Sequence, residues 1–306
     1  MMIALVRQLR LEADRVMSVR LTDPDGRPLP PWRPGAHVGI ELPTGLTRQY
    51  SLCGSPADRD GYRIGVLRER RSRGGSEYVH SFLRPGQRLR ITEPRNNFPL
   101  VAADRYLFIA GGIGITPILP MIEQVGARPW RLAYCGRSVD SLAFLDELTT
   151  HSGHVDVFAD GNRLALTALL AEPRPGTAVY ACGPESLLAG VEEAMTGWPT
   201  GSLHLERFAA RPKPVLPNHE FEVVCARSGR TVTVPVDRST LDVLQDNGIP
   251  VEGSCREGVC GTCQVRVLDG TPDHRDDILS DAERVAGDRM FVCVSRCAGS
   301  RLVLDV

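Results

Sequence analysis

The stretch CREGVCGTC, residues 255–263, sets three cysteines within nine residues of a 306-residue chain that holds nine cysteines in all. The N-terminus has no apolar run long enough for a signal peptide, and no later stretch is long enough to span a membrane. We therefore expect a cytoplasmic protein. In that reducing compartment disulfides are rare, so clustered cysteines indicate a metal site or catalysis.

The spacing within this stretch is C-x4-C-x2-C, and a fourth cysteine follows thirty residues later. The four candidate ligands are Cys255, Cys260, Cys263 and Cys293. This spacing is typical of plant-type [2Fe–2S] sites, in which four thiolates bind two irons. Gly253, Gly258 and Gly261 allow a tight loop whose backbone N–H groups can point at the sulfurs. A structural zinc site is the alternative, although zinc modules usually supply two pairs of ligands.

Cys297 competes with Cys293 as the fourth ligand because it lies only four residues later. If residues 290–296 form an extended strand, the two positions are about 13 Å apart and cannot both bind the cluster. Cys293 belongs to the apolar run MFVCV, which would shield a thiolate. Cys297 begins the polar segment CAGSR, so we expect it to be exposed and Cys293 to be the ligand.

The remainder of the chain changes its pattern twice. Residues 1–100 contain short alternating strands broken by Pro and Gly, which indicates a small antiparallel barrel or sandwich. From about residue 104, apolar runs ending in Gly alternate with helical patterns, which predicts a parallel sheet with ligands at the carboxyl ends of its strands. The segment AARPKPVLPN, residues 209–218, has three prolines and is the best linker candidate.

Two glycine turns in the βα region are candidates for nucleotide binding. AGGIGITP, residues 110–117, follows an apolar run and opens a helix, whose N-terminus would favour a pyrophosphate. YACGPES, residues 180–186, repeats the strand–Gly–Pro–helix form, and the two turns would face one crevice if both strands belong to the same sheet. Cys182 in the second turn is expected either to pack in the core or to touch a nicotinamide ring.

Two segments of the barrel region suggest a phosphate and aromatic-ring site. These are RQYSL, residues 48–52, and SRGGSEY, residues 72–78. Arg48 and the N–H groups near Gly74, Gly75 and Ser76 could bind a phosphate, and Tyr50 could stack on a ring. A phosphate-and-ring site, a pyrophosphate site and a one-electron cluster are together the parts of an electron-transfer chain.

These motifs, together with NNFPL, HLERF, DHRDDILS and MFVCVSR, resemble the phthalate dioxygenase reductase family within the ferredoxin–NADP reductase superfamily. The resemblance covers almost the whole chain. It implies an antiparallel β-barrel flavin domain, an α/β parallel-sheet NAD domain and a C-terminal α+β plant-type ferredoxin domain of the β-grasp kind. The expected domains are 1–101 for FMN, 102–208 for NAD, a linker at 209–218 and the ferredoxin at 219–306.

The resemblance also implies cofactors and their ligands. FMN rather than FAD would be bound by Arg48, Tyr50, Ser51, Leu52, Gly74, Gly75 and Ser76, with Phe208 near the flavin. NADH would be bound by Gly111, Gly112, Gly114, Thr116, Arg137, Cys182, Gly183 and Pro184. Where the family typically continues SRA after its last ligand, this chain has SRC, which leaves the role of Cys297 open.

The expected function is an NADH-dependent flavin and iron–sulfur oxidoreductase that passes hydride from NADH to FMN, then single electrons through the [2Fe–2S] cluster to a terminal oxygenase. The partner is a Rieske non-haem iron oxygenase, favoured by the resemblance, or a cytochrome P450. The alternative, from another functional class, is an electron-carrier protein whose NAD site is inactive. The cofactors carry this chemistry, so we expect no catalytic side chain. A net charge of −1 argues against nucleic acid, and we expect a monomer.

Overall fold

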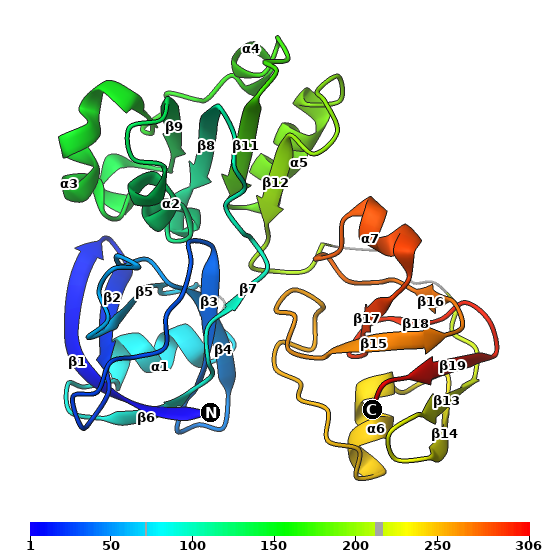
Figure 1. Cartoon of the computed structure of the whole chain (residues 1–306). Coiled ribbons are helices and arrows are strands. Elements are labelled where there is room, and N and C mark those ends of the chain that lie inside the picture. The colour runs from blue at the N-terminus through cyan, green and yellow to red at the C-terminus, as the bar shows by residue number, and fades with distance from the viewer. Residues whose placement is uncertain (71, 212–216) are drawn as a thin grey trace. The chain divides into compact units, whose positions relative to one another are not determined.

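The computed structural model describes residues 1–70, 72–211 and 217–306. The chain divides into two compact units, Met1–Arg207 and Phe208–Val306 (Figure 1). Residues 212–216, inside the expected linker at 209–218, lie outside the described residues. Among the helices of the described part, none has the length and apolar character needed to cross a membrane.

The first part of unit 1 is an antiparallel barrel. Its elements are β1 (Met2–Ala13), β2 (Val16–Thr22), β3 (Ala36–Glu41), β4 (Thr47–Ser51), β5 (Tyr62–Leu67), α1 (Gly75–Ser81), β6 (Arg88–Ile91) and β7 (Arg95–Asn96). The sheet order is β4-β3-β6-β1-β2-β5, with β7 paired to β3. An antiparallel bridge between Leu52 and Ile64 joins the two end strands and closes the barrel, so the RQYSL segment lies next to β5.

The second part of unit 1 is a parallel sheet covered by helices. Its strands are β8 (Arg105–Gly111), β9 (Trp130–Cys135), β10 (Val155–Phe158), β11 (Thr177–Cys182) and β12 (Leu203–Glu206), and its helices are η1 (Gly112–Ile115), α2 (Ile118–Val125), η2 (Val139–Ser141), α3 (Leu145–Leu148), η3 (Thr149–His154), α4 (Leu166–Leu169) and α5 (Glu185–Ala194). The order β10-β9-β8-β11-β12 puts β8 and β11, which precede the two glycine turns, side by side. The turns therefore meet at one edge of the sheet.

Strand β8 has an apolar core on both of its faces. Phe108 and Ala110 pack with α2 on one face, whereas Leu107 and Ile109 pack with α5 on the other (Figure 1). Successive side chains of a strand point to opposite faces, so a strand covered on both sides reads as a continuous apolar run. This explains the run YLFIA in the sequence.

Unit 2 has a mixed sheet with short helices. Its elements are β13 (Phe221–Cys225), β14 (Arg230–Val234), α6 (Thr240–Asp246), β15 (Gln264–Asp269), β16 (Pro272–Asp273), α7 (Asp281–Ala286), β17 (Arg289–Phe291), β18 (Arg296–Cys297) and β19 (Arg301–Leu304). The order is β14-β13-β19-β15-β17, with β13 and β19 parallel, and β16 pairs with β18. The barrel, the parallel sheet and this α+β unit confirm the predicted fold class.

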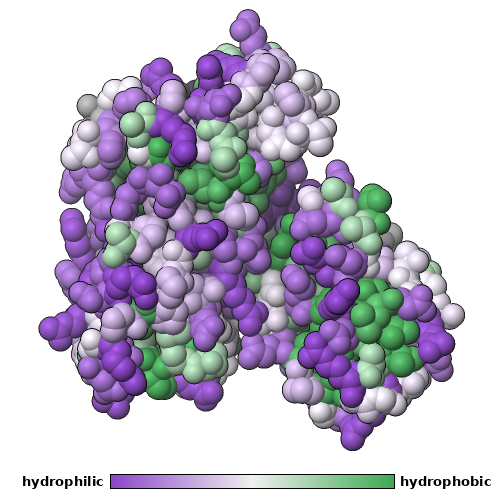
Figure 2. Space-filling view, viewed as in Figure 1, coloured by the Kyte–Doolittle hydropathy of each residue, from purple (hydrophilic) through white to green (hydrophobic). Residues whose placement is uncertain are grey.

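Hydrophobic residues gather over part of unit 2 in the view of Figure 2, while the visible face of unit 1 is largely hydrophilic. Among the described residues, four large apolar side chains of unit 2 are well exposed, namely Phe208, Val236, Leu268 and Val285, the last with 89% of its surface open. Isolated exposed apolar residues are ordinary on protein surfaces.

Candidate functional site

The four predicted cluster ligands converge in unit 2. The thiol of Cys255 is in hydrogen-bond contact with those of Cys260 and Cys293, and Cys263 contacts Cys293. Cys260, Cys263 and Cys293 are buried, while Cys255 is half-buried. Two loop positions of the stretch have positive φ that glycine tolerates, Gly258 at +71° and Gly261 at +76°. The loop therefore folds back on itself and brings its sulfurs together.

The donor set fits a [2Fe–2S] cluster. The backbone N–H of Glu257 donates to the Cys255 sulfur at 3.3 Å, as expected for a loop that points N–H groups at sulfur. Contacts with Cys260 and Cys293 hold the pKa of Cys255 well below its usual range and raise the pKa of both partners. Within the described residues, no group of three or more His, Cys, Asp or Glu side chains is arranged to hold a metal ion. In a [2Fe–2S] cluster four thiolates are shared between two irons, so each iron needs only two of them. The observation that bears on such a cluster is therefore the set of pairwise contacts between the four cysteines.

Two expectations about the fourth ligand are wrong. Residues 290–296 are not one strand, because β17 ends at Phe291 and the Phe291 carbonyl then accepts hydrogen bonds from the N–H groups of Val294 and Ser295. Cys293 therefore lies in a turn. Cys297 is fully buried rather than exposed, since it belongs to β18 and its thiol donates to the Arg301 carbonyl at 3.4 Å. Cys293 contacts the other thiols all the same, and it remains our proposed ligand.

The segment after the cluster loop is tied to the chain that enters unit 2. The Asp277 carboxylate, which is fully buried, accepts hydrogen bonds from the Arg211 N–H at 3.0 Å and from the Arg211 Nε at 2.8 Å. The Asp277 N–H in turn donates to the Gly258 carbonyl at 2.9 Å, inside the cluster loop. Arg211 is therefore connected to the cluster loop through a single residue.

The predicted FMN residues lie together in the barrel. Arg48, on β4, packs over the N-terminus of α1, where a Cβ on Gly75 would come within 2.7 Å of the Arg48 side chain. Its guanidinium donates to the Arg73 carbonyl at 3.1 Å. Gly74 has a φ of +93°, and the N–H groups of Gly75 and Ser76 open the helix, where the first N–H groups have no intrahelical acceptor. A cation and free donors thus meet in one place, which fits a phosphate group.

Tyr50 and Leu52 follow Arg48 in the same RQYSL segment. Burial raises the pKa of Tyr50 to about 12, which the charge of Arg48 partly offsets. Leu52 is fully buried in the barrel core. Phe208 is the first residue of unit 2 and is 44% exposed, and its place beside a flavin remains a prediction.

The two nucleotide turns touch each other through backbone atoms. A Cβ on Gly114 would lie 2.2 Å from the Cys182 carbonyl oxygen, and one on Gly183 would lie 2.9 Å from the Gly111 Cα. Only glycine permits this approach. The predicted residues of the two turns are Gly111, Gly112, Gly114, Thr116, Cys182, Gly183 and Pro184, and Arg137 is exposed just after β9, the neighbouring strand of the sheet. The first turn forms η1, and α2 then begins at Ile118 with Pro117 as its N-cap.

Sequence reasoning missed Glu206, the last residue of β12. Its carboxyl group accepts a hydrogen bond from the Ser51 hydroxyl at 3.3 Å, and the Cys182 thiol approaches the same oxygen at 4.0 Å. Burial raises the pKa of Glu206 to about 8, and the Ser51 hydrogen bond offsets part of this shift. Glu206 therefore joins a predicted FMN residue to a predicted NADH residue. Its position at the carboxyl end of a parallel strand, where such sheets bind ligands, was the available signal.

We expect this carboxyl group to make the stability of the protein depend on pH. Between its ordinary pKa of 4.5 and about 8, the folded protein keeps a proton that the unfolded chain releases. The free energy of unfolding should therefore fall as pH rises through this window, by up to about 1.4 kcal/mol per pH unit. Glu206→Gln should flatten the slope, as measured by urea unfolding at pH 5, 6, 7 and 8. Glu193→Gln, at an exposed position of α5, is the control, and equal slopes in all three proteins would contradict the expectation.

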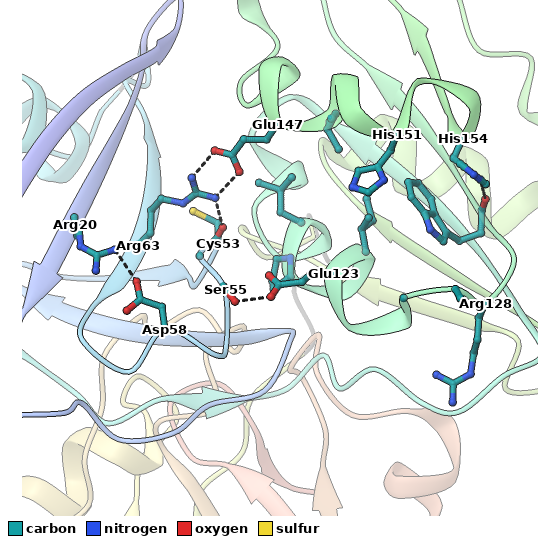
Figure 3. Close-up of a pocket in the computed structure, with 18 residues that line it drawn as sticks. Arg20, Cys53, Ser55, Asp58, Arg63, Glu123, Arg128, Glu147, His151 and His154 are labelled. Atoms are coloured by element: carbon teal, nitrogen blue, oxygen red, sulfur yellow. Dashed lines mark hydrogen bonds and ion pairs between the residues drawn. The ribbon is translucent and has the colours of Figure 1, made fainter.

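A crevice of about 760 Å³ opens elsewhere in unit 1, beside α2 (Figure 3). Its walls carry three contacts between polar side chains, Arg20–Asp58, Arg63–Glu147 and Ser55–Glu123. The residues predicted to bind cofactors are not part of its lining. The crevice is thus separate from the region where Ser51 and Cys182 meet.

Comparison with known proteins places the chain in a family. Residues 223–298 match the 2Fe-2S iron–sulfur cluster binding domain. The vanillate O-demethylase oxidoreductase of Pseudomonas sp. (strain HR199 / DSM 7063) is 43% identical over 313 residues, 99% of each chain. The solved phthalate dioxygenase reductase, described as a modular structure for electron transfer from pyridine nucleotides to [2Fe–2S], is 36% identical, with a TM-score of 0.72 and coverage of 100% of this chain and 98% of that one. This chain belongs to the phthalate dioxygenase reductase family.

A third relative has a different architecture. An intact type IV self-sufficient cytochrome P450 monooxygenase has a TM-score of 0.95 and 43% identity over all of this chain, which spans only 41% of that protein. Membership in the family confirms the predicted enzyme class, an oxidoreductase that serves oxygenase systems, and the predicted cofactors NADH, FMN and a [2Fe–2S] cluster.

Proposed function

We propose that the protein is the NADH-dependent reductase component of a multicomponent oxygenase whose terminal component is a Rieske non-haem iron protein. The observation that carries this proposal is the convergence of Ser51 and Cys182 on the Glu206 carboxyl group. A residue from the flavin strand and one from the nucleotide turn lie around one carboxyl oxygen, as a site that brings a flavin and a nicotinamide together requires.

In this proposal the barrel holds FMN. Arg48 and the N–H groups of Gly75 and Ser76 bind its phosphate, since a guanidinium and free backbone donors make strong charge-assisted hydrogen bonds. Tyr50 lines its ring, and Leu52, whose side chain is buried in the barrel core, contacts the flavin through its backbone. Bound FMN supplies the step from two-electron to one-electron chemistry. Glu206, whose pKa is raised, stays largely protonated near neutral pH and keeps a negative charge away from this region.

The two glycine turns bind NADH. Gly111, Gly112 and Gly114 let the pyrophosphate approach the backbone at the carboxyl edge of the sheet. Cys182 lies on the nicotinamide side, next to Glu206. Arg137, exposed after β9, contacts the adenosine ribose.

The four thiolates of Cys255, Cys260, Cys263 and Cys293 hold the cluster. Cys255 is the most exposed of the four and offers the shortest path for electrons from the cluster to a partner protein. The relatives act in oxygenase systems, which supports a terminal oxygenase as the acceptor. The P450-fused relative, at 43% identity, favours a cytochrome P450 as the second candidate partner. Cysteine usage supports a cytoplasmic location, and we propose that the protein acts as a monomer.

An anaerobic titration with NADH tests the proposal directly. We expect the purified protein to have flavin and iron–sulfur absorption bands that both bleach on NADH addition, and acid to release FMN. Cluster bands without flavin would support an electron carrier with an inactive NAD site, a colourless protein would support zinc, and stoichiometric FAD would contradict the flavin assignment. Rates of cluster reoxidation by a purified Rieske oxygenase and by a P450 then separate the two partners.

We also propose the domain division 1–101, 102–208 and 219–306, with the prolines of 209–218 between the last two. A 1–208 fragment is therefore expected to retain flavin and to oxidise NADH with ferricyanide at close to the full-length rate. It should reduce cytochrome c poorly, because the one-electron centre is missing. Both rates can be measured by absorbance against the intact chain. A fragment that precipitates or loses its flavin would place the ferredoxin within the folding unit of the first two domains.

A further inference from the structure

Strand β5 of the barrel presents one face to the parallel-sheet half of unit 1. Arg63 and Gly65 are two residues apart and therefore point to the same face of the strand. At Gly65 a Cβ would lie 2.8 Å from the Thr116 Cγ2 and 3.3 Å from the Ile113 Cδ1. Thr116 belongs to the first nucleotide turn, so β5 is in direct contact with the segment proposed to bind NADH.

Arg63 extends this contact with an ion pair (Figure 3). Its guanidinium binds both carboxylate oxygens of Glu147, at 2.5 and 2.8 Å, and also donates to the Cys53 carbonyl at 2.7 Å. It lies 5.0 Å from the centre of the Phe144 ring. A bidentate pair fixes orientation as well as distance, so the pair constrains the angle between the two halves.

Both ends of the pair belong to elements of secondary structure. Glu147 belongs to α3, which starts after Phe144, a buried residue with the unusual φ of +63°. On the other side, the Arg63 carbonyl accepts the N–H of Cys53 at 2.8 Å, directly after the RQYSL segment. The pair therefore runs from α3 of one half to the backbone that continues the proposed flavin strand.

We propose that Arg63 and Glu147 form a positioning pair that sets the approach of the nicotinamide to the flavin. This inference rests on the proposed function. Neither side chain contacts the residues proposed to bind cofactors directly. The connection to them runs through β5 and the Cys53 backbone. The pair acts by holding Thr116 and the RQYSL segment in register, and misplacement of reacting groups by about 1 Å can cost about a hundredfold in rate.

An ion pair that only stabilises the fold would not affect the reaction rate. The same crevice contains a pair of this kind, which serves as a comparison. Arg20 and Asp58 pair at 2.7 Å with side chains 36% and 31% exposed, and both belong to the barrel. Arg63 and Glu147 are 24% and 39% exposed, a similar range, but they join the two halves. Exposed pairs contribute little to stability, so both pairs should be weak stabilisers and only one should affect the reaction.

The test compares matched variants of the full-length, cofactor-loaded protein. These are Arg63→Met, Glu147→Gln, the double variant, the exchanged pair Arg63→Glu with Glu147→Arg, and the control pair Arg20→Met with Asp58→Asn. At saturating NADH, each single variant should slow anaerobic flavin reduction about tenfold, the double variant no further, and the exchanged pair should recover at least half of the loss. Flavin content should be unchanged, and the controls should match the unmodified protein.

Hydrogen exchange of residues 62–67 and 111–117, measured without NADH, gives a readout that does not depend on turnover. We expect faster exchange in the single variants than in the controls, with protection regained in the exchanged pair. Unchanged exchange and rates in the single variants, or equal effects in the controls, would overturn the proposal. If NADH fails to reduce the unmodified protein, the proposed function is wrong. The hydrogen-exchange data still show in that case whether the pair holds the two halves of unit 1 together.

Discussion

Replacing Cys293 by serine is expected to abolish the iron–sulfur absorption and the electron-spin signal of the protein. Cys293 contacts the thiols of both Cys255 and Cys263, so its loss removes one of four thiolate ligands at the centre of the group. A serine oxygen is a harder donor that suits iron–sulfur chemistry poorly. NADH oxidation with ferricyanide should continue, since the residues proposed to bind FMN, apart from Phe208, belong to unit 1.

Cys297→Ser is the matched control for this substitution. Cys297 is buried even more completely than Cys293, but it bonds to the Arg301 carbonyl rather than to the other thiols. We expect its serine variant to keep the cluster spectrum and to lose only stability, by about 1 kcal/mol or somewhat more, because a hydroxyl replaces a well-packed thiol in the core. Loss of the cluster in Cys297→Ser with retention in Cys293→Ser would reverse our ligand assignment.

The second large effect is expected from Gly114→Ala. The added methyl group would lie 2.2 Å from the Cys182 carbonyl oxygen and 2.8 Å from the Gly183 nitrogen, and both are backbone atoms that cannot rotate away. The two nucleotide turns must therefore separate. We expect a rise in KM for NADH of at least about tenfold and a loss of stability of about 1–3 kcal/mol from overpacking.

Steady-state kinetics and thermal unfolding of Gly114→Ala measure both effects. Gly197→Ala, in the same half of unit 1, is the control, because a Cβ there meets no atom within 4 Å. Flavin content should be unaffected in both variants, because the atoms nearest to a Cβ on Gly114 belong to Cys182 and Gly183 rather than to the barrel. A normal KM in Gly114→Ala would mean that the turns are not the nucleotide site.

Much of the architecture could be predicted because it depends on local patterns. The cysteine spacing and the glycines of the cluster loop predict the ligand set before any folding is considered. The apolar runs of β8 and β11, each followed by a glycine turn, likewise predict adjacent parallel strands with a shared edge. In both cases the residues that act together are close in sequence or repeat one pattern.

The misses concern contacts between distant residues. FVCVS has the composition of a strand, but hydrogen bonds to the Phe291 carbonyl turn the chain at Cys293. Cys297 precedes polar residues, yet pairing with Pro272 buries it in the core. Glu206 and Ser51 are 155 residues apart, and no local pattern connects them.

The hydrogen bonds between Arg211 and Asp277 bear on how the ferredoxin module can be cut and grafted. A fragment that begins at residue 219, as the proline pattern suggests, would lose the Arg211 contacts of a carboxylate that is fully buried. The Asp277 N–H also donates to the Gly258 carbonyl of the cluster loop. Loss of the Arg211 contacts would therefore disturb the part of the module that must retain iron. A transplantable module therefore starts before Arg211 and takes the proline segment with it.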